Sequence, residues 1–192
     1  MTALLDDPET VGGSSIPATS IGAIVDGRQV NTGRILTSGI DMNVRYSLTA
    51  GANRFDLGLK GTYVLQYREK VTPLSPAVDE LDRAAYPVAF RGRGTAGWSR
   101  GPLSGQVGVN YVNRYHDLAG KRIGSWTTVD LELGYTAPAT SGWAKGFTAS
   151  LSVQNLFDRA PPFYDSPVGA GYDAANASAL MRFVALQLSK RW

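Results

Sequence analysis

The sequence contains no cysteine and a single histidine, His116. Disulfide bonds and thiolate metal sites are therefore excluded, as is any metal site built from several histidines. The sequence also contains no run of about 18 apolar residues, which excludes a transmembrane helix. A membrane-spanning β-barrel remains open, because barrel strands alternate apolar and polar residues and never produce such a run.

A strong excess of charge of one sign is also absent. The 192 residues carry a net charge of +3, with 19 Lys and Arg against 16 Asp and Glu scattered along the chain. Because no dense basic cluster is present, the sequence does not indicate a nucleic-acid partner.

The main positive signal is a repeated period-two pattern. From Leu36 to Leu48 the even positions are mostly apolar and the odd positions mostly polar, which is the period of a strand rather than of a helix. The same alternation recurs in six later segments, and a weaker candidate strand covers residues 20–25. We therefore predict an all-β fold, an antiparallel up-and-down meander of seven or eight long strands. After the first strand, the expected ranges are 54–68, 88–99, 103–115, 128–135, 147–154 and 184–192.

The connections between these segments alternate in length. Those near Ala50 and Gly101 and at 138–145 are short to moderate, whereas 69–86, 115–123 and 157–178 are longer. Outer-membrane barrels have short periplasmic turns and longer extracellular loops. If the C-terminus is periplasmic, every long connection is extracellular.

Aromatic side chains on the apolar positions form two groups, as expected where a barrel crosses two membrane interfaces. The expected periplasmic group is Phe55, Trp98, Tyr135, Phe147 and Trp192, and the outer group is Tyr63, Tyr67, Phe90, Tyr111 and Tyr115. The residues expected to face lipid are Leu57, Leu59, Val107, Leu131, Leu151 and Leu186. Those expected to face the lumen are Arg45, Lys60, Arg93, Gln106, Glu132 and Gln187.

A soluble sandwich or lipocalin-like barrel would also alternate, but its apolar face would have to be packed inside. The many long charged side chains on the polar positions, and strands of ten or more residues, favour a membrane barrel because soluble strands average about 5–6 residues.

The last third of the chain closely resembles the TonB-dependent receptors. The resemblance is carried by Arg122-Ile-Gly-Ser-Trp-Thr-Thr-Val-Asp130, Val153-Gln-Asn-Leu-Phe-Asp158, Gly171-Tyr-Asp-Ala-Ala-Asn176, Arg182-Phe and Leu188-Ser-Lys-Arg-Trp192. It implies that Asn155, Leu156, Phe157 and Asp158 end the penultimate strand. It also implies a C-terminal signal for the barrel-assembly machinery, made of Val184, Leu186, Leu188 and Trp192.

The family implies a bacterial outer-membrane barrel of 22 strands, filled by a plug, that takes up iron chelates or other nutrients. We expect residues 1–19 to be a mobile leader and 20–192 to be the C-terminal segment of such a barrel, with the plug and the signal peptide absent. Partners would then be outer-membrane lipid, the assembly machinery and, only through the missing plug, the TonB system. The alternatives are a small stand-alone outer-membrane barrel, structural or adhesive, and a soluble binding barrel.

No catalytic site, metal or cofactor is expected. His116 adjoins Asp117 without a serine motif, and Asp130 and Glu132 are interpreted as lumen lining rather than a glycosidase pair. Arg91, Arg93 and Arg114 are the candidate ligand contacts, because they lie near long loops and would attract anionic chelates. The alternative is that the first two arginines pair with lumen carboxylates, which are Asp56, Asp130 and Glu132.

Overall fold

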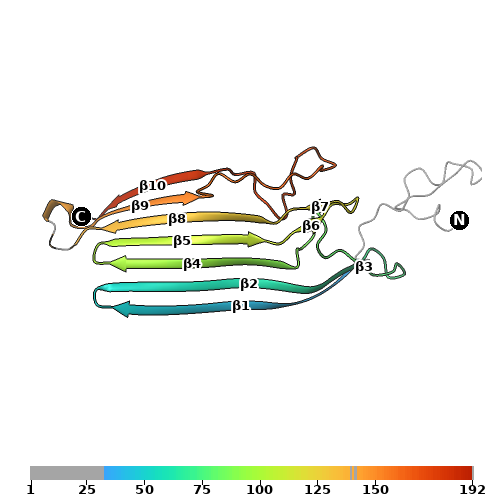
Figure 1. Cartoon of the computed structure of the whole chain (residues 1–192), viewed down its shortest axis with the longest axis horizontal. Coiled ribbons are helices and arrows are strands. Elements are labelled where there is room, and N and C mark those ends of the chain that lie inside the picture. The colour runs from blue at the N-terminus through green and yellow to red at the C-terminus, as the bar shows by residue number, and fades with distance from the viewer. Residues whose placement is uncertain (1–32, 139, 141, 192) are drawn as a thin grey trace, which may run out of the picture. The chain divides into compact units, whose positions relative to one another are not determined.

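The computed structural model describes residues 33–138, 140 and 142–191. Seven long strands lie side by side in one antiparallel sheet (Figure 1), in the order β1-β2-β4-β5-β8-β9-β10. The predicted all-β meander is confirmed. The proposed leader at 1–19, the eighth strand at 20–25 and Trp192 lie outside the described residues. Among the described residues, no helix is long and apolar enough to cross a membrane.

The strands agree with the alternating segments of the sequence to within a few residues. Two further short strands pair with each other, a third short strand pairs with the end of β2, and one 3₁₀ turn lies between β8 and β9. The bounds are β1 Arg34–Ala50, β2 Asn53–Lys70, β3 Val78–Asp79, β4 Phe90–Arg100, β5 Leu103–Val112, β6 Tyr115–His116, β7 Arg122–Ile123, β8 Trp126–Thr136, η3 Gly142–Ala144, β9 Phe147–Gln154 and β10 Phe183–Lys190.

Through the middle of the sheet, the register places apolar residues opposite apolar ones and mostly polar or small residues opposite each other. Residues directly opposite in a strand pair share a face. An apolar row therefore crosses all seven long strands on one face, the apolar face, through Tyr46, Leu57, Ala96, Val107, Leu131, Val153 and Val184. The adjacent row lies on the other face, the polar face, and consists of Ser47, Asp56, Gly97, Gln106, Glu132, Ser152 and Ala185.

The connections separate by length as the sequence predicts. The short ones, at 51–52, 101–102 and 137–146, lie at one end of the sheet, and the long ones, at 71–89, 113–125 and 155–182, lie at the other (Figure 1). We call the second end the loop end.

A β-bulge overturns part of the predicted facing. The register of β1 with β2 shifts between Ser38 and Gly39, which skips Leu65. Beyond this point Tyr67 is opposite Thr37, a polar-face position, and its ring lies 6.1 Å from that of Tyr86 in the β2–β4 connection. The expectation that Tyr67 belongs to an aromatic band on the apolar face is therefore wrong. A single extra residue exchanges the two faces of a strand because the side-chain period is two.

Tyr115 is also misplaced by the period-two pattern. The fourth predicted strand, at 103–115, corresponds to β5, which ends three residues earlier, at Val112. Tyr115 is only 2% exposed, in a small core formed by the long connections. The members of this core are Ala84, Val88, Val112, Tyr115, Ile123 and Tyr164, with Trp126 packed against it. The remaining outer aromatics do gather on the apolar face, since the Phe90 ring lies 6.5 Å from Tyr63 and 6.0 Å from Tyr111.

The C-terminal strand β10 is an edge strand that pairs only with β9 among the described residues. Its apolar positions, Val184, Leu186 and Leu188, are all exposed. Lys190 is a charged residue at a position of the apolar face, and its side chain contacts the β8–β9 connection. Its Nζ donates to the Trp143 carbonyl at 2.6 Å and lies 5.9 Å from the centre of the indole ring.

Candidate ligand-binding site

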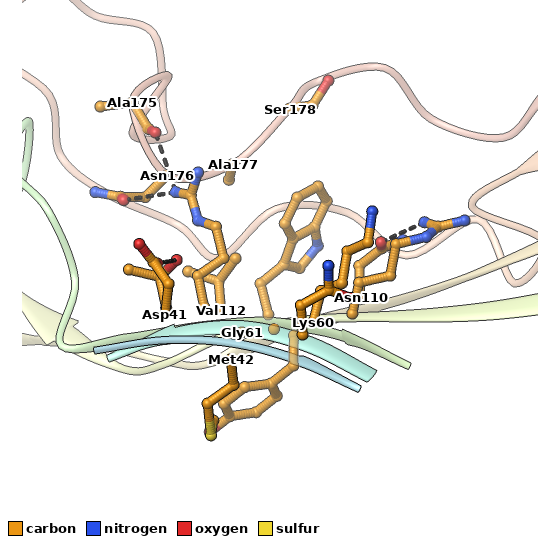
Figure 2. A pocket seen from close by; sticks show the side chains of 17 residues that line it. Asp41, Met42, Lys60, Gly61, Asn110, Val112, Ala175, Asn176, Ala177 and Ser178 are labelled. Atoms are coloured by element: carbon orange, nitrogen blue, oxygen red, sulfur yellow. Dashed lines mark hydrogen bonds between the residues drawn. The ribbon is translucent and has the colours of Figure 1, made fainter. Parts of the chain in front are cut away.

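A hollow of about 550 Å³ lies on the polar face, near the loop end. Its floor is formed by β1, β2, β4 and β5, and residues 175–178 of the β9–β10 connection pass over it. Figure 2 shows Asp41, Lys60 and Asn110 on the same side of the sheet as this segment, with Met42 on the opposite side. The long connection thus folds back over the polar face rather than extending away from the sheet.

Arg91 joins the sheet to this overlying segment. Its Nη2 donates to Asn176 Oδ1 at 2.9 Å and to the Ala175 carbonyl at 3.3 Å. Both acceptors are neutral, so the positive charge of Arg91 is hydrogen-bonded without being neutralised by these contacts. The expectation that Arg91 pairs with a carboxylate is wrong for the part of the chain that the structure describes.

Arg93 has a different environment, although it is only two residues away on the same face. Its Nη1 lies 2.6 Å from Asp130 Oδ2 and also donates to Asn110 Oδ1. Asn110 in turn donates to Asp130 Oδ2 at 2.9 Å and to Thr128 Oγ1 at 3.1 Å. The predicted pairing of Arg93 with a carboxylate is confirmed, with Asp130 as the partner.

The path of the Arg93 side chain depends on Gly108, which lies opposite Asp130 in the register of β5 with β8. A Cβ at Gly108 would come 2.8 Å from the guanidinium carbon of Arg93. Glycine therefore leaves the space through which Arg93 reaches across β5 to Asp130.

Two lining residues were not predicted as ligand contacts, although Lys60 was expected to face the lumen. Lys60 is an exposed cation on the floor of the hollow, and Trp126 lines it from the start of β8. The indole Nε1–H of Trp126 is buried and finds no hydrogen-bond acceptor among the described residues. A buried donor without a partner costs roughly 1–3 kcal/mol. The alternation identifies Lys60 as polar-face, but no sequence signal marks the Trp126 donor.

Arg114, the third candidate, is exposed between β5 and β6 and does not line the hollow. The other residues considered for chemistry show no arrangement for catalysis. His116 has an exposed side chain, and its main chain bonds Asp82 and Ala84. Asp130 is bound by Arg93, whereas Glu132 is exposed. In the described part of the chain, no group of acidic, histidine or cysteine side chains could hold a metal ion.

The Asn155–Asp158 motif forms a turn that holds the start of the β9–β10 connection. Asn155 has φ +50° and Asp158 φ +56°, in the left-handed region that asparagine and aspartate tolerate. The main-chain N–H of Asn155 donates to Asp130 Oδ1 at 3.1 Å. The Asn155 side chain makes two hydrogen bonds to the main chain of Arg159. Asp158 Oδ1 accepts from the Arg182 N–H at 2.7 Å, just before β10 begins. The motif therefore closes the loop at its base.

A buried polar cluster fixes the overlying segment at its other end. Asp173 and Asn176 are each 4% exposed. Asp173 accepts hydrogen bonds from the Ala85 N–H and the Asn176 side chain, which also donates to the Tyr86 carbonyl. Burial, followed by the charge and hydrogen bond of Asp173, raises the pKa of Tyr115 well above its usual value. Three connections far apart in sequence are thus joined into one unit beside the hollow.

A family model described as "TonB dependent receptor-like, beta-barrel" matches residues 4–156. No curated protein and no solved structure matches the chain.

Proposed function

The chain belongs to the family of TonB-dependent receptor-like β-barrels, and we propose that it forms the C-terminal part of an outer-membrane receptor that takes up iron chelates or other nutrients. Members of this family are outer-membrane transporters rather than enzymes. The observation that carries the proposal is the asymmetry of the sheet. One face presents apolar rows across all seven long strands, while the long connections cover the hollow on the other.

In this proposal the apolar face contacts outer-membrane lipid and the polar face lines the barrel lumen. Every backbone group must be hydrogen-bonded inside a bilayer. Further strands must therefore pair with the outer edges of β1 and β10, which have no partner strand among the described residues. As in the family, coupling to TonB would run through a plug domain.

The hollow would bind the anionic part of a ligand. Arg91 and Lys60 supply positive charge at its lining. Arg93 is already neutralised by Asp130, so its role would be to position the floor of the hollow. Asp41 lines the same hollow, with its carboxylate accepting a hydrogen bond from Thr62.

The first test is Arg91→Gln in the full-length receptor, with ferric citrate as an anionic iron chelate and a neutral hydroxamate chelate as the comparison. We expect the affinity for ferric citrate to fall by about tenfold, because a charge-assisted hydrogen bond contributes roughly 1.5 kcal/mol. Binding is measured by the quenching of tryptophan fluorescence. Lys121→Gln, an exposed cation in the β5–β8 connection, is the control and should leave binding unchanged. If Arg91→Gln binds ferric citrate as the parent does, Arg91 is not a ligand contact.

The second test concerns assembly. We propose that the barrel-assembly machinery reads Val184, Leu186, Leu188 and the terminal Trp192, because an extended strand can be captured at a sheet edge through backbone pairing and alternate side chains. Deleting Trp192 should reduce the assembled fraction several-fold, whereas Trp192→Phe should retain most of it, since an aromatic ring at the interface is kept. Heat-modifiable gel mobility measures the assembled fraction. Equal assembly of the deletion and the parent would exclude the signal role.

A further inference from the structure

The bulge at Leu65 has an effect on charge as well as on Tyr67. Beyond it, Arg68 lies opposite Leu36 and Lys70 lies opposite Arg34. Leu36 and Arg34 are even positions of β1, like Val44 and Tyr46 on the apolar face. Arg34, Arg68 and Lys70 therefore lie on the outward extension of the apolar face, at the loop end. We call these residues the outer basic patch.

The intervening residues of β2 support this facing independently. Tyr67 and Glu69 alternate with Arg68 and Lys70, so they must lie on the polar face if the patch lies on the apolar face. The Tyr67 ring centre lies 6.1 Å from that of Tyr86. Tyr86 belongs to the connection that lies over the polar face.

The patch lies a short distance beyond the aromatic cluster of Tyr63, Phe90 and Tyr111. Tyr63 is opposite Ile40 and Arg68 is opposite Leu36, so the two rows are four residues of β1 apart. At about 3.4 Å per residue this is about 14 Å along the strand. A strand tilt of roughly 35–45° reduces it to about 10 Å along the membrane normal. Since aromatic rings mark the interface, the patch reaches the level of the outer headgroups and the sugars above them.

The cations of the patch are not neutralised by their described neighbours. Arg34, Arg68 and Lys70 form no ion pair among the residues that the structure describes. Asp79 of β3 lies opposite Arg68, but its Oδ1 accepts from the Leu81 N–H at 3.1 Å and no ion pair joins the two side chains. The outer basic patch therefore carries three positive charges, and Asp79 is the one carboxylate opposite a patch residue in the described part of the chain.

The pairing of Arg34 with Lys70 is unfavourable without an anion. Like charges directly opposite each other in a strand pair repel, and their Cβ atoms are only about 5 Å apart. An anion held between them would convert this repulsion into attraction, as in other sites where Arg and Lys bind phosphate.

We infer that the outer basic patch binds the phosphate groups of the glycolipid in the outer leaflet. This surface is separate from the ligand hollow, because the patch lies on the apolar face and the hollow on the polar face. The inference rests on the proposed function only for the placement of the apolar face against the outer membrane.

The test uses the full-length protein extracted from outer membranes, with the triple variant Arg34→Gln, Arg68→Gln and Lys70→Gln. Its control is Lys121→Gln, Arg122→Gln and Lys145→Gln, which removes the same charge outside the patch. Bis-phosphorylated lipid A in phosphatidylcholine vesicles is the probe, with phosphatidylglycerol as the second anionic lipid. Each Lys or Arg near an anionic surface contributes roughly a fivefold gain in binding at low salt. After screening at physiological salt, we expect the triple variant to bind lipid A about tenfold more weakly and the control to bind as the parent does.

Each outcome has a separate meaning. If the triple variant and its control bind lipid A equally, the patch is not the site. If the parent binds phosphatidylglycerol vesicles as tightly as lipid A vesicles, and the triple variant loses affinity for both equally, the assignment to the glycolipid is overturned. Sucrose-gradient fractionation of the parent tests the membrane placement on its own. If the parent is found in the outer membrane but the triple variant loses no affinity for lipid A, this inference alone is overturned. If the parent is absent from the outer membrane, the proposed function is overturned.

Discussion

Replacing Leu131 with arginine is expected to lower the free energy of unfolding in lipid by about 2–4 kcal/mol. Leu131 lies in the middle of β8, between Val107 of β5 and Val153 of β9, in the apolar row that crosses the sheet. If this row contacts lipid tails, an arginine there must either lose its hydration or distort the bilayer to keep it. Equilibrium refolding into vesicles over a series of denaturant concentrations measures the change.

The matched control is Glu132→Arg, at the next residue of the same strand. Glu132 faces Gln106 and Ser152 on the polar face and is exposed. An arginine there would remain in the aqueous lumen, so we expect a change within about 0.5 kcal/mol. A larger loss for Glu132→Arg than for Leu131→Arg would mean that the sheet faces the membrane the other way round.

Removing the carboxylate of Asp130 is expected to destabilise the barrel by about 2–3 kcal/mol and to loosen the β9–β10 connection. Asp130 accepts from Arg93 and Asn110 through Oδ2 and from the Asn155 N–H through Oδ1. Asp130→Ala leaves these donors unsatisfied and Arg93 without its ion partner. Loss of one member of a fully buried pair costs about 3–5 kcal/mol. We expect less here because the Arg93 side chain is 39% exposed.

Hydrogen exchange separates the two effects of Asp130→Ala. Faster exchange of the Asn155 and Leu156 amides would report release of the turn, because the Leu156 N–H donates to the Val129 carbonyl beside Asp130. Glu132→Ala is the control, since Glu132 is an exposed carboxylate on the same strand and face. Unchanged exchange at Asn155 in Asp130→Ala would show that the motif holds its turn without the carboxylate.

The long strands and their order follow from information that is local in the sequence. The alternation from Leu36 to Leu48 identifies β1 because side chains alternate between the two faces of a strand. Turn lengths identify which ends of the strands meet, because adjacent strands in an antiparallel meander reverse direction. Local patterns of this kind also predicted the connections at the loop end and the polar-face position of Arg93.

The positions that the sequence misplaced depend on contacts between distant residues. Tyr67 and Tyr115 have the alternation expected of a lipid band, yet the Leu65 bulge turns the first to the polar face and a core of three connections buries the second. A bulge is defined by pairing with a partner strand, so a single strand read alone contains no sign of it.

The difference between Arg91 and Arg93 has the same origin. They occupy equivalent polar-face positions of β4, and their spacing gives no reason for different roles. Gly108, 15 residues after Arg93 in the sequence, opens the path to Asp130, whereas Asn176 comes to Arg91 from a connection 85 residues away. The alternation of side chains along each strand thus determined the fold class and the two faces. The packing of segments distant in sequence decided which charges are neutralised and which can meet a ligand or a lipid. An ion pair requires atoms within a few ångströms, whereas the alternation along the chain records only which face a residue occupies.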